Sequence, residues 1–233
     1  FNCKGISKGL VEVYDKPSIY YPISNMIDAG ITDILIIAAP DNVDDYRRVL
    51  GDGSGLNVNF SYDVQEKPRG IAEAFVIGSD FIGDDDVALM FGDNIFNGNR
   101  FIEAMKKARQ SVRGALVFAY RVGLKEAKNF GVVEFDARGR AISLEEKPET
   151  PKSPFAVPGA YFYTSKVVEL AKTLQPSARG ELEVTDLNRL FLEENLLDVV
   201  TLDTDTDWHD TGTARSLRRA INAVADWQDD HDD

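Results

Sequence analysis

The sequence contains one cysteine, Cys3, and two histidines, His209 and His231. A single cysteine cannot form an internal disulfide, and it provides no cysteine-based metal cluster. The chain also lacks a Ser-His-Asp set, a cysteine nucleophile with partners and the ligand spacing of a zinc site. These absences exclude the common covalent hydrolases and zinc enzymes. The cysteine usage favours the cytoplasm as the compartment.

Long hydrophobic runs are absent too. No apolar stretch approaches the roughly 18 residues of a membrane span, and the N-terminus has no signal-peptide pattern. Asp and Glu total 39 against 26 Lys and Arg, so the formal net charge is -13. This balance argues against binding to nucleic acid or to anionic lipid, because both require clustered cations. The acidity is typical of a solvated, repulsive surface, or of adaptation to a salty cytoplasm.

The 233 residues, 43% of them hydrophobic, suffice for one large domain with a substantial core. Short apolar runs alternate with amphipathic stretches. Residues 34–39 and 87–91 are predicted to be buried strands, and a helix is expected between Asp41 and Gly51. This alternation predicts an α/β fold with a Rossmann-like, doubly wound, mixed but mainly parallel sheet.

The pattern changes from Ala115 onwards. Strands predicted at 116–121, 131–135, 141–146 and 160–164 follow one another with little helix between them, which indicates antiparallel additions to the same sheet. We therefore expect a single domain over residues 1–233. Within it we expect two halves, at about 1–113 and at about 114–233, divided where the pattern changes.

The first residues raise a question of completeness. Lys16-Pro17 predicts the start of a helix that ends near Gly30. In a doubly wound fold such a helix follows a strand and a phosphate-binding turn, and only residues 1–10 stand before it. Because a parallel sheet without a central strand would expose unpaired backbone groups, we expect that the natural protein does not begin at Phe1.

Two carboxylates follow apolar segments, where ligands bind in open α/β sheets. Asp93, in Gly-Asp-Asn after the strand at 87–91, suits Mg²⁺, but it could equally form an Asx-turn. Asp210 is either the second metal carboxylate or a helix cap, and Thr213 is better placed to cap. His209 has no histidine cluster to join.

Lys8 and Lys147 are the candidate cations. Lys147 follows a strand beside Glu146, a combination that suits a hydroxylated, phosphorylated ligand or an ordinary edge ion pair. Arg179 lies in a loop that could bind phosphate and sugar hydroxyls or cap the next helix. Together, the carboxylates and separated cations indicate phosphoryl or nucleotidyl transfer, in which positioning and charge neutralisation provide the catalysis.

Several strings of the chain resemble successive blocks of the glucose-1-phosphate thymidylyltransferases, a family of sugar-1-phosphate nucleotidyltransferases. They are KGISKGLVEVYDKPSIYYP (4–22), AGITDILII (29–37), GIAEAF (70–75), FGDNIF (91–96), FGVVEF (130–135), ISLEEKP (142–148), ARGELEVTDLN (178–188) and WHDTGT (208–213). The resemblance runs from about residue 4 to 225, in order and at compatible spacing.

The resemblance implies an enzyme that joins dTTP, or UTP, to glucose 1-phosphate with Mg²⁺ and releases pyrophosphate, for deoxysugar or rhamnose-type sugar biosynthesis. It also implies a homo-oligomer, a tetramer in this family. The catalytic residues that it implies are Lys8, Asp93, Lys147 and Asp210, with Asp93 and Asp210 as metal ligands. The nucleotide-binding residues that it implies are Lys8, Gln65, Gly70 and Asp93. The sugar-phosphate residues that it implies are Gly131, Glu146, Lys147, Val157, Tyr161 and Arg179.

The chain departs from the family pattern at several positions. The family's opening strand and glycine-rich phosphate loop are not in the sequence, and its C-terminal helical extension is shortened. Gly9 replaces a usual Gln, Glu12 a Pro, Phe130 a Tyr, and His209 an apolar residue. The alternative is therefore a catalytically impaired relative that binds nucleotide or sugar phosphate, or a structural partner protein.

Overall fold

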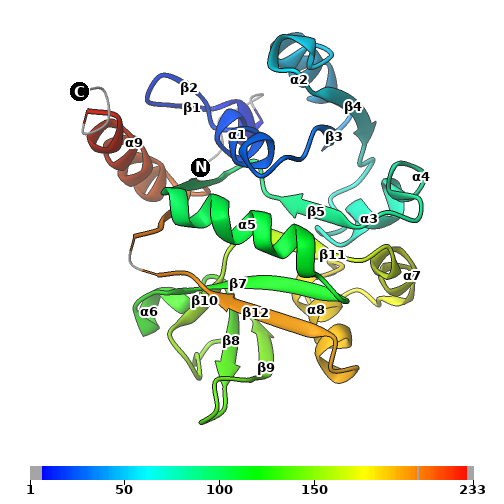
Figure 1. Ribbon diagram of the computed structural model, residues 1–233, viewed down its shortest axis with the longest axis vertical. Helices are drawn as coiled ribbons and strands as arrows, with labels where there is room; N and C mark the ends of the chain where they lie inside the picture. The colour runs from blue at the N-terminus through cyan, green and yellow to red at the C-terminus, as the bar shows by residue number, and fades with distance from the viewer. Residues whose placement is uncertain (1–6, 204, 230–233) are drawn as a thin grey trace.

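The computed structural model describes residues 7–203 and 205–229 (Figure 1). Its helices are α1 (Tyr20–Asp28), α2 (Val43–Leu50), α3 (Glu73–Ile77), α4 (Ser79–Ile82), α5 (Asn99–Ser111), α6 (Leu124–Ala127), α7 (Lys166–Thr173), α8 (Val184–Glu193) and α9 (Ala214–Asp229). Its strands are β1 (Glu12–Val13), β2 (Lys16–Pro17), β3 (Asp33–Ala38), β4 (Asn59–Val64), β5 (Val87–Met90), β6 (Asn94–Asn97), β7 (Ala115–Arg121), β8 (Gly131–Phe135), β9 (Ala141–Glu146), β10 (Phe155–Val157), β11 (Ala160–Tyr163), β12 (Leu197–Thr201) and β13 (Asp207–Asp210).

The main sheet has the order β5-β11-β7-β10-β8-β9, and β12 also pairs with β7. All of its pairings are antiparallel except that of β12 with β7. The prediction of a mainly parallel sheet is therefore wrong, although the α/β class and the mixed sheet are confirmed. The physical reason is β11, which inserts between β5 and β7 in the opposite direction, so two parallel strands contact each other only through an antiparallel one. The expected antiparallel strands after Ala115 are confirmed.

Helices cover both faces of this sheet. Because successive side chains of a strand point to opposite faces, β7 contributes to two cores. Leu116 and Phe118 pack in a cluster with residues of α5, while Val117 and Ala119 pack in a cluster with residues of α3, α7 and α8. Figure 1 accordingly shows α5 in front of the sheet and α8 behind it. Both cores anchor the strands whose ends carry the candidate site.

The remaining strands of the N-terminal half form a separate parallel pair, β3 with β4. Among the described residues, no backbone ladder joins this pair to β5. A cavity lies between them, lined by Leu35 and Ile37 of β3 and by Leu89 and Met90 of β5. The further strand expected at this place from the sequence stays a prediction.

The segment before α1 differs from its prediction. Lys16 and Pro17 belong to β2, which pairs with β1 in a hairpin where Tyr14 has φ 61°. The predicted helix starts later, at Tyr20, because Lys16 and Pro17 pair across this hairpin. The hairpin packs against α9, and Val13 forms a small hydrophobic cluster with Ala220 and Val224 of that helix.

The last helix begins as predicted. Thr213 Oγ1 accepts a hydrogen bond from Ser216 N at 3.1 Å, and Ser216 Oγ accepts one from Thr213 N at 3.0 Å. This reciprocal capping fixes the start of α9 directly after β13. No helix in the described part of the chain is long and apolar enough to cross a bilayer.

Candidate active site

A cavity of about 1640 Å³ opens at the ends of several strands. Five of the predicted site residues line it: Lys8, Gln65, Asp93, Lys147 and Asp210. The other six are not among the residues that line it: Gly70, Gly131, Glu146, Val157, Tyr161 and Arg179. The site thus has a group that faces the cavity and a second group that the following contacts connect to it.

The two predicted metal carboxylates lie on neighbouring strands. Asp93 precedes β6, Asp210 ends β13, and Asn94 is the antiparallel partner of Asp210. Thr211 fastens the junction, since its backbone N and its Oγ1 both donate to the Asp93 carbonyl, at 2.9 and 3.0 Å. Two segments more than 100 residues apart in the sequence therefore present their carboxylates together.

Each carboxylate has one neutral donor. Asn94 Nδ2 donates to Asp93 Oδ1 at 3.1 Å, and Gly212 N donates to Asp210 Oδ1 at 2.8 Å. Burial, and then the charge of Asp93, raise the pKa of Asp210 above its usual range, against the opposing effects of the Gly212 N–H, Lys8 and Lys147. Two crowded, partly buried carboxylates are a donor set that fits a divalent cation with oxygen preference. The metal role of this pair stays a prediction.

Lys8 lies in a short 3₁₀ turn, Lys8–Leu10, on the wall of the cavity. Ser18 Oγ is 3.2 Å from the Lys8 carbonyl and 2.9 Å from the Gly92 carbonyl, so it ties this turn to the segment that carries Asp93. The departure at Gly9 has a steric reason. A Cβ there would lie 2.4 Å from the hydroxyl oxygen of Tyr46, which also hydrogen-bonds Ser7 at 2.7 Å.

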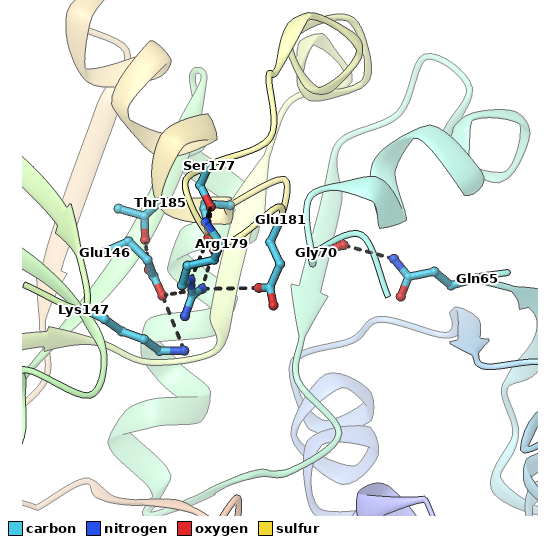
Figure 2. Close-up of polar contacts among 9 residues, drawn as sticks. Gln65, Gly70, Glu146, Lys147, Ser177, Arg179, Glu181 and Thr185 are labelled. Carbon is cyan, nitrogen blue, oxygen red and sulfur yellow. Dashed lines mark hydrogen bonds and ion pairs between the residues drawn. The ribbon is translucent and has the colours of Figure 1, made fainter. Parts of the chain in front are cut away.

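Gln65 and Gly70, the predicted base-binding residues, are in contact. Gln65 Nε2 donates to the Gly70 carbonyl at 3.0 Å (Figure 2). It also donates to Glu73 Oε2 at 2.8 Å. Gly70 has φ 104°, and a Cβ there would lie 2.4 Å from the carbonyl oxygen of Leu182. Only glycine fits this close approach, which joins the Gln65 loop to the loop that carries Arg179.

Glu146 is the centre of the second group. Gly131 lies beside it in the sheet and separates it from Val157, since Gly131 pairs with Glu146 on one side and with Val157 on the other. Thr185 Oγ1 donates to Glu146 Oε2 at 2.5 Å. A Cβ at Gly131 would lie 2.9 Å from the Thr185 hydroxyl, so this glycine leaves the space in which the threonine meets Glu146.

Two cations approach the same oxygen of Glu146. Lys147 Nζ lies 3.7 Å and Arg179 Nη2 lies 3.5 Å from Glu146 Oε1. Figure 2 shows both side chains converging on this carboxylate from different segments. Lys147 also has φ 43°, a backbone conformation uncommon for a residue with a side chain. The arrangement can bind an anion next to a hydroxyl acceptor.

Tyr161 lies further in, on β11 between β5 and β7. Its side chain is buried, and burial together with the charge of Glu146 raises its pKa far above the usual range. Tyr161 therefore stays a neutral phenol. Its contacts with Phe91 and Tyr163 rings support the floor of the site.

Some contributors were not singled out from the sequence. Thr185, Thr211 and Asn94 bind site carboxylates or their backbone, and Glu183 binds Arg179. Each lies in one of the sequence blocks that resemble the family, and this position is the signal by which the sequence could have identified it. His209, whose Nε2 lies 2.7 Å from Asp207 Oδ2, lines the cavity without a histidine partner among the described residues.

Comparison with known proteins assigns the family. The model of the nucleotidyl transferase family matches residues 3–226. The chain belongs to this family. It is also similar to curated glucose-1-phosphate thymidylyltransferases, so the resemblance noted in the sequence is confirmed. The protein of Neisseria meningitidis is 52% identical over 221 residues, which are 95% of this chain and 76% of the relative. That of Mycolicibacterium smegmatis is 51% identical over 220 residues, 94% of this chain and 75% of the relative.

Solved structures agree with this assignment. A crystal structure from Bacillus anthracis, assigned as a glucose-1-phosphate thymidylyltransferase and bound to sucrose, has a TM-score of 0.85 and 38% identity. The match covers 95% of this chain and 87% of that one. A UDP-glucose pyrophosphorylase with UDP-glucose has a TM-score of 0.83 at 23% identity, and at that identity it supports the fold alone. The fold is thus the mixed α/β fold of the sugar nucleotidyltransferases.

Proposed function

We propose that this protein is a glucose-1-phosphate thymidylyltransferase, which converts dTTP and glucose 1-phosphate into dTDP-glucose and pyrophosphate. A phosphate oxygen of the sugar phosphate forms a bond to the α-phosphorus of dTTP. The bond from that phosphorus to the β-phosphate bridge breaks, and pyrophosphate leaves with the electron pair. The product serves deoxysugar biosynthesis of the rhamnose type.

One observation carries this proposal: Lys147 lines the cavity together with Asp93 and Asp210, and it also lies beside Glu146 of the second group. It approaches Glu146 at 3.7 Å, and its charge acts on Asp210 and on Glu183 beside Arg179. A cation at this junction faces the place where a sugar phosphate must meet a nucleotide α-phosphate. There it neutralises charge on both reactants, the main requirement of nucleotidyl transfer.

The remaining residues take roles that follow from their surroundings. Lys8 contacts the triphosphate, Lys147 and Arg179 contact the sugar phosphate, and Glu146 accepts hydrogen bonds from sugar hydroxyls. Asp93 and Asp210 would hold Mg²⁺, which when bound supplies charge neutralisation at the triphosphate. Tyr161 and the backbone near Gly131 and Val157 shape the sugar side.

The base is held at the opposite side of the cavity. Gln65 uses its amide N–H groups on Gly70 and Glu73, so its Oε1 is oriented and can accept from the N3–H of thymine or uracil. Both bases present that donor. We propose dTTP as the substrate, with UTP as the competitor to be measured.

The function is tested with the full chain, dTTP, glucose 1-phosphate and Mg²⁺, by the release of pyrophosphate. The expected result is release that requires both substrates and is lost with a chelator. No release above background would favour the impaired relative, and glucose 1-phosphate binding measured by calorimetry would then distinguish a binding protein from a structural partner.

The assembly and organisation are part of the same proposal. We propose a cytoplasmic homo-oligomer, a tetramer, whose mass light scattering would measure. Residues up to about 113 would bind the nucleotide, and those from about 114 would bind the sugar phosphate, within a single domain. Isothermal titration with each substrate separately, on variants of each half, would test this division.

A further inference from the structure

Arg179 is held by a carboxylate that is itself buried. Arg179 Nε donates to Glu183 Oε1 at 3.0 Å and Arg179 Nη2 donates to Glu183 Oε2 at 2.8 Å. The Glu183 side chain is only 7% exposed, whereas Glu181, which accepts from the same Nη2 at 3.2 Å, is 44% exposed. One carboxylate thus forms a two-point, desolvated contact, and the other a single contact at the rim.

The contact orients the guanidinium. Among the described residues, the hydrogen bonds of Arg179 use Nε and Nη2, which leaves the Nη1 amino group for a ligand. A two-point contact along one edge of a planar guanidinium fixes both the position and the plane of the group. The Glu183 side of Arg179 is therefore occupied. Figure 2 shows Arg179 and Lys147 beside the same carboxylate, Glu146.

Glu183 is in turn held by a second hydrogen-bond donor, Ser177. Ser177 Oγ donates to Glu183 Oε1 at 2.7 Å. Ser177 also starts the tight loop that carries Arg179, since Gly180 N and Arg179 N both bond to Ser177, at 2.8 and 3.2 Å. Glu183 itself directly precedes α8, so a helix of the core carries the carboxylate.

The charge of Glu183 is maintained in spite of its burial. Burial works to raise its pKa, but the hydrogen bonds from Arg179 and Ser177 and the charges of Arg179 and Lys147 outweigh it and hold the pKa below the usual range. Burying a charged carboxylate is costly unless it is paired. Arg179 provides that pairing, so Glu183 acts as its fixed counter-ion.

We infer that Glu183 is a positioning residue, which acts through Arg179 to hold the guanidinium in the orientation that binds the phosphate of the sugar 1-phosphate. Glu181 is not needed for this role. The inference rests on the proposed function, because the phosphate is that of the proposed substrate.

The test compares Glu183→Gln with Glu181→Gln, a matched pair on one arginine. With Glu183→Gln we expect the KM for glucose 1-phosphate to rise about tenfold or more, as for the loss of a charge-assisted hydrogen bond. The KM for dTTP should change by less than about twofold, because only Arg179 is affected. Glu181→Gln should change neither KM by more than about twofold, since exposed pairs contribute little.

A double-mutant cycle with Arg179→Ala tests the route of action. If Glu183 acts through Arg179, the double variant binds glucose 1-phosphate no more weakly than Arg179→Ala alone. Additive effects, an equal rise of both KM values, or an effect of Glu181→Gln as large as that of Glu183→Gln would overturn the inference. If Glu183→Gln does not fold, Ser177→Ala removes the second contact of Glu183, and a rise of a few fold in the glucose 1-phosphate KM alone is then expected; no rise would refute it.

Failure of this inference is distinguishable from failure of the proposed function. If the unmodified protein turns over and Glu183→Gln has an unchanged KM, only the inference is wrong. If the unmodified protein releases no pyrophosphate, calorimetry with glucose 1-phosphate still tests it: weaker binding by Glu183→Gln alone supports the positioning role, and equal binding by both variants contradicts it.

Discussion

The two sides of the cavity differ in how firmly they are held. On the sugar side, Glu146, Lys147 and Arg179 lie on or beside a continuous antiparallel sheet, and each contacts at least one other charged group. On the proposed nucleotide side, β3 and β4 form a separate pair, and the Gln65 side chain is held by Gly70 and by Glu73 of α3. The comparison teaches that, under the proposed function, the sugar phosphate would meet a site whose charged groups already hold one another, whereas the nucleotide would meet one with fewer such contacts.

The largest effect on the reaction rate is expected from the two carboxylates proposed to hold Mg²⁺, Asp93 and Asp210. Asp93→Asn and Asp210→Asn should each lower the rate of pyrophosphate release about 10²–10³-fold or more, because the charge of the carboxylate is lost from the centre of the reaction. The double variant should be little worse than either single one, since the pair acts as a unit. Asp198→Asn serves as the control, because Asp198 lies on β12 and forms an exposed ion pair with Arg113. An Asp93→Asn variant with half of the original rate would contradict this assignment.

Lys147 should rank next. Lys147→Ala removes the cation between the two sides, so we expect kcat to fall about 100-fold and the KM for glucose 1-phosphate to rise. Steady-state kinetics with each substrate varied would measure both values. Lys152→Ala is the matched control, because Lys152 pairs with the neighbouring Glu145 on the exposed side. A change in the dTTP KM alone would assign Lys147 to the nucleotide side and contradict the proposed division between the two sides.

A smaller effect concerns the nucleotide side and its stability. Gly9→Ala places a methyl group against the Tyr46 hydroxyl, and overpacking of this kind costs about 1–3 kcal/mol. Tyr46→Phe removes that oxygen and leaves Tyr46 Cζ, 3.3 Å from the added Cβ, as the nearest atom. We therefore expect Gly9→Ala to be better tolerated in the Tyr46→Phe background, measured by urea unfolding. Equal costs in both backgrounds would show that Tyr46 does not select glycine at this position.

The smallest effect is expected from pH on the sugar side. Because the folded-state pKa of Glu183 is lowered, its contribution to stability is present above the usual Glu range and is lost as the pH falls through the lowered pKa. Unmodified protein should therefore have a Tm about 2–4 °C above that of Glu183→Gln at pH 7, a difference that shrinks as the pH is lowered towards 3. A Tm difference that is constant over this range would contradict a charged Glu183.

The sequence predicted the strands at 34–39 and 87–91 because short apolar runs that end at turn residues are too short for most helices and fit buried strands. It failed on the direction of the main sheet. Direction depends on which strands pair, and β11 pairs with both β5 and β7 through contacts that no local pattern encodes. Likewise, Lys16-Pro17 is a good helix start locally, but here it pairs with β1 in a hairpin.

The candidate site was predictable in part for the same reason. Asp93 and Lys147 each follow a strand, where ligands are expected, and a motif marks both. The pairing of Asn94 with Asp210 joins distant segments and was not foreseen. For Arg179 the sequence left phosphate binding and helix capping open. The structure provides no side-chain cap at the start of α8 and instead pairs Arg179 with Glu183.

The central claim is that a phosphate oxygen of glucose 1-phosphate attacks the α-phosphorus of dTTP on this protein. Its most direct test is ³¹P NMR of the full chain with Mg²⁺, dTTP and glucose 1-phosphate whose non-bridging phosphate oxygens are ¹⁸O. We predict dTDP-glucose with ¹⁸O in the bridge between its phosphates, together with unlabelled pyrophosphate. Unchanged substrates, or pyrophosphate release that leaves glucose 1-phosphate unconsumed, would contradict the account.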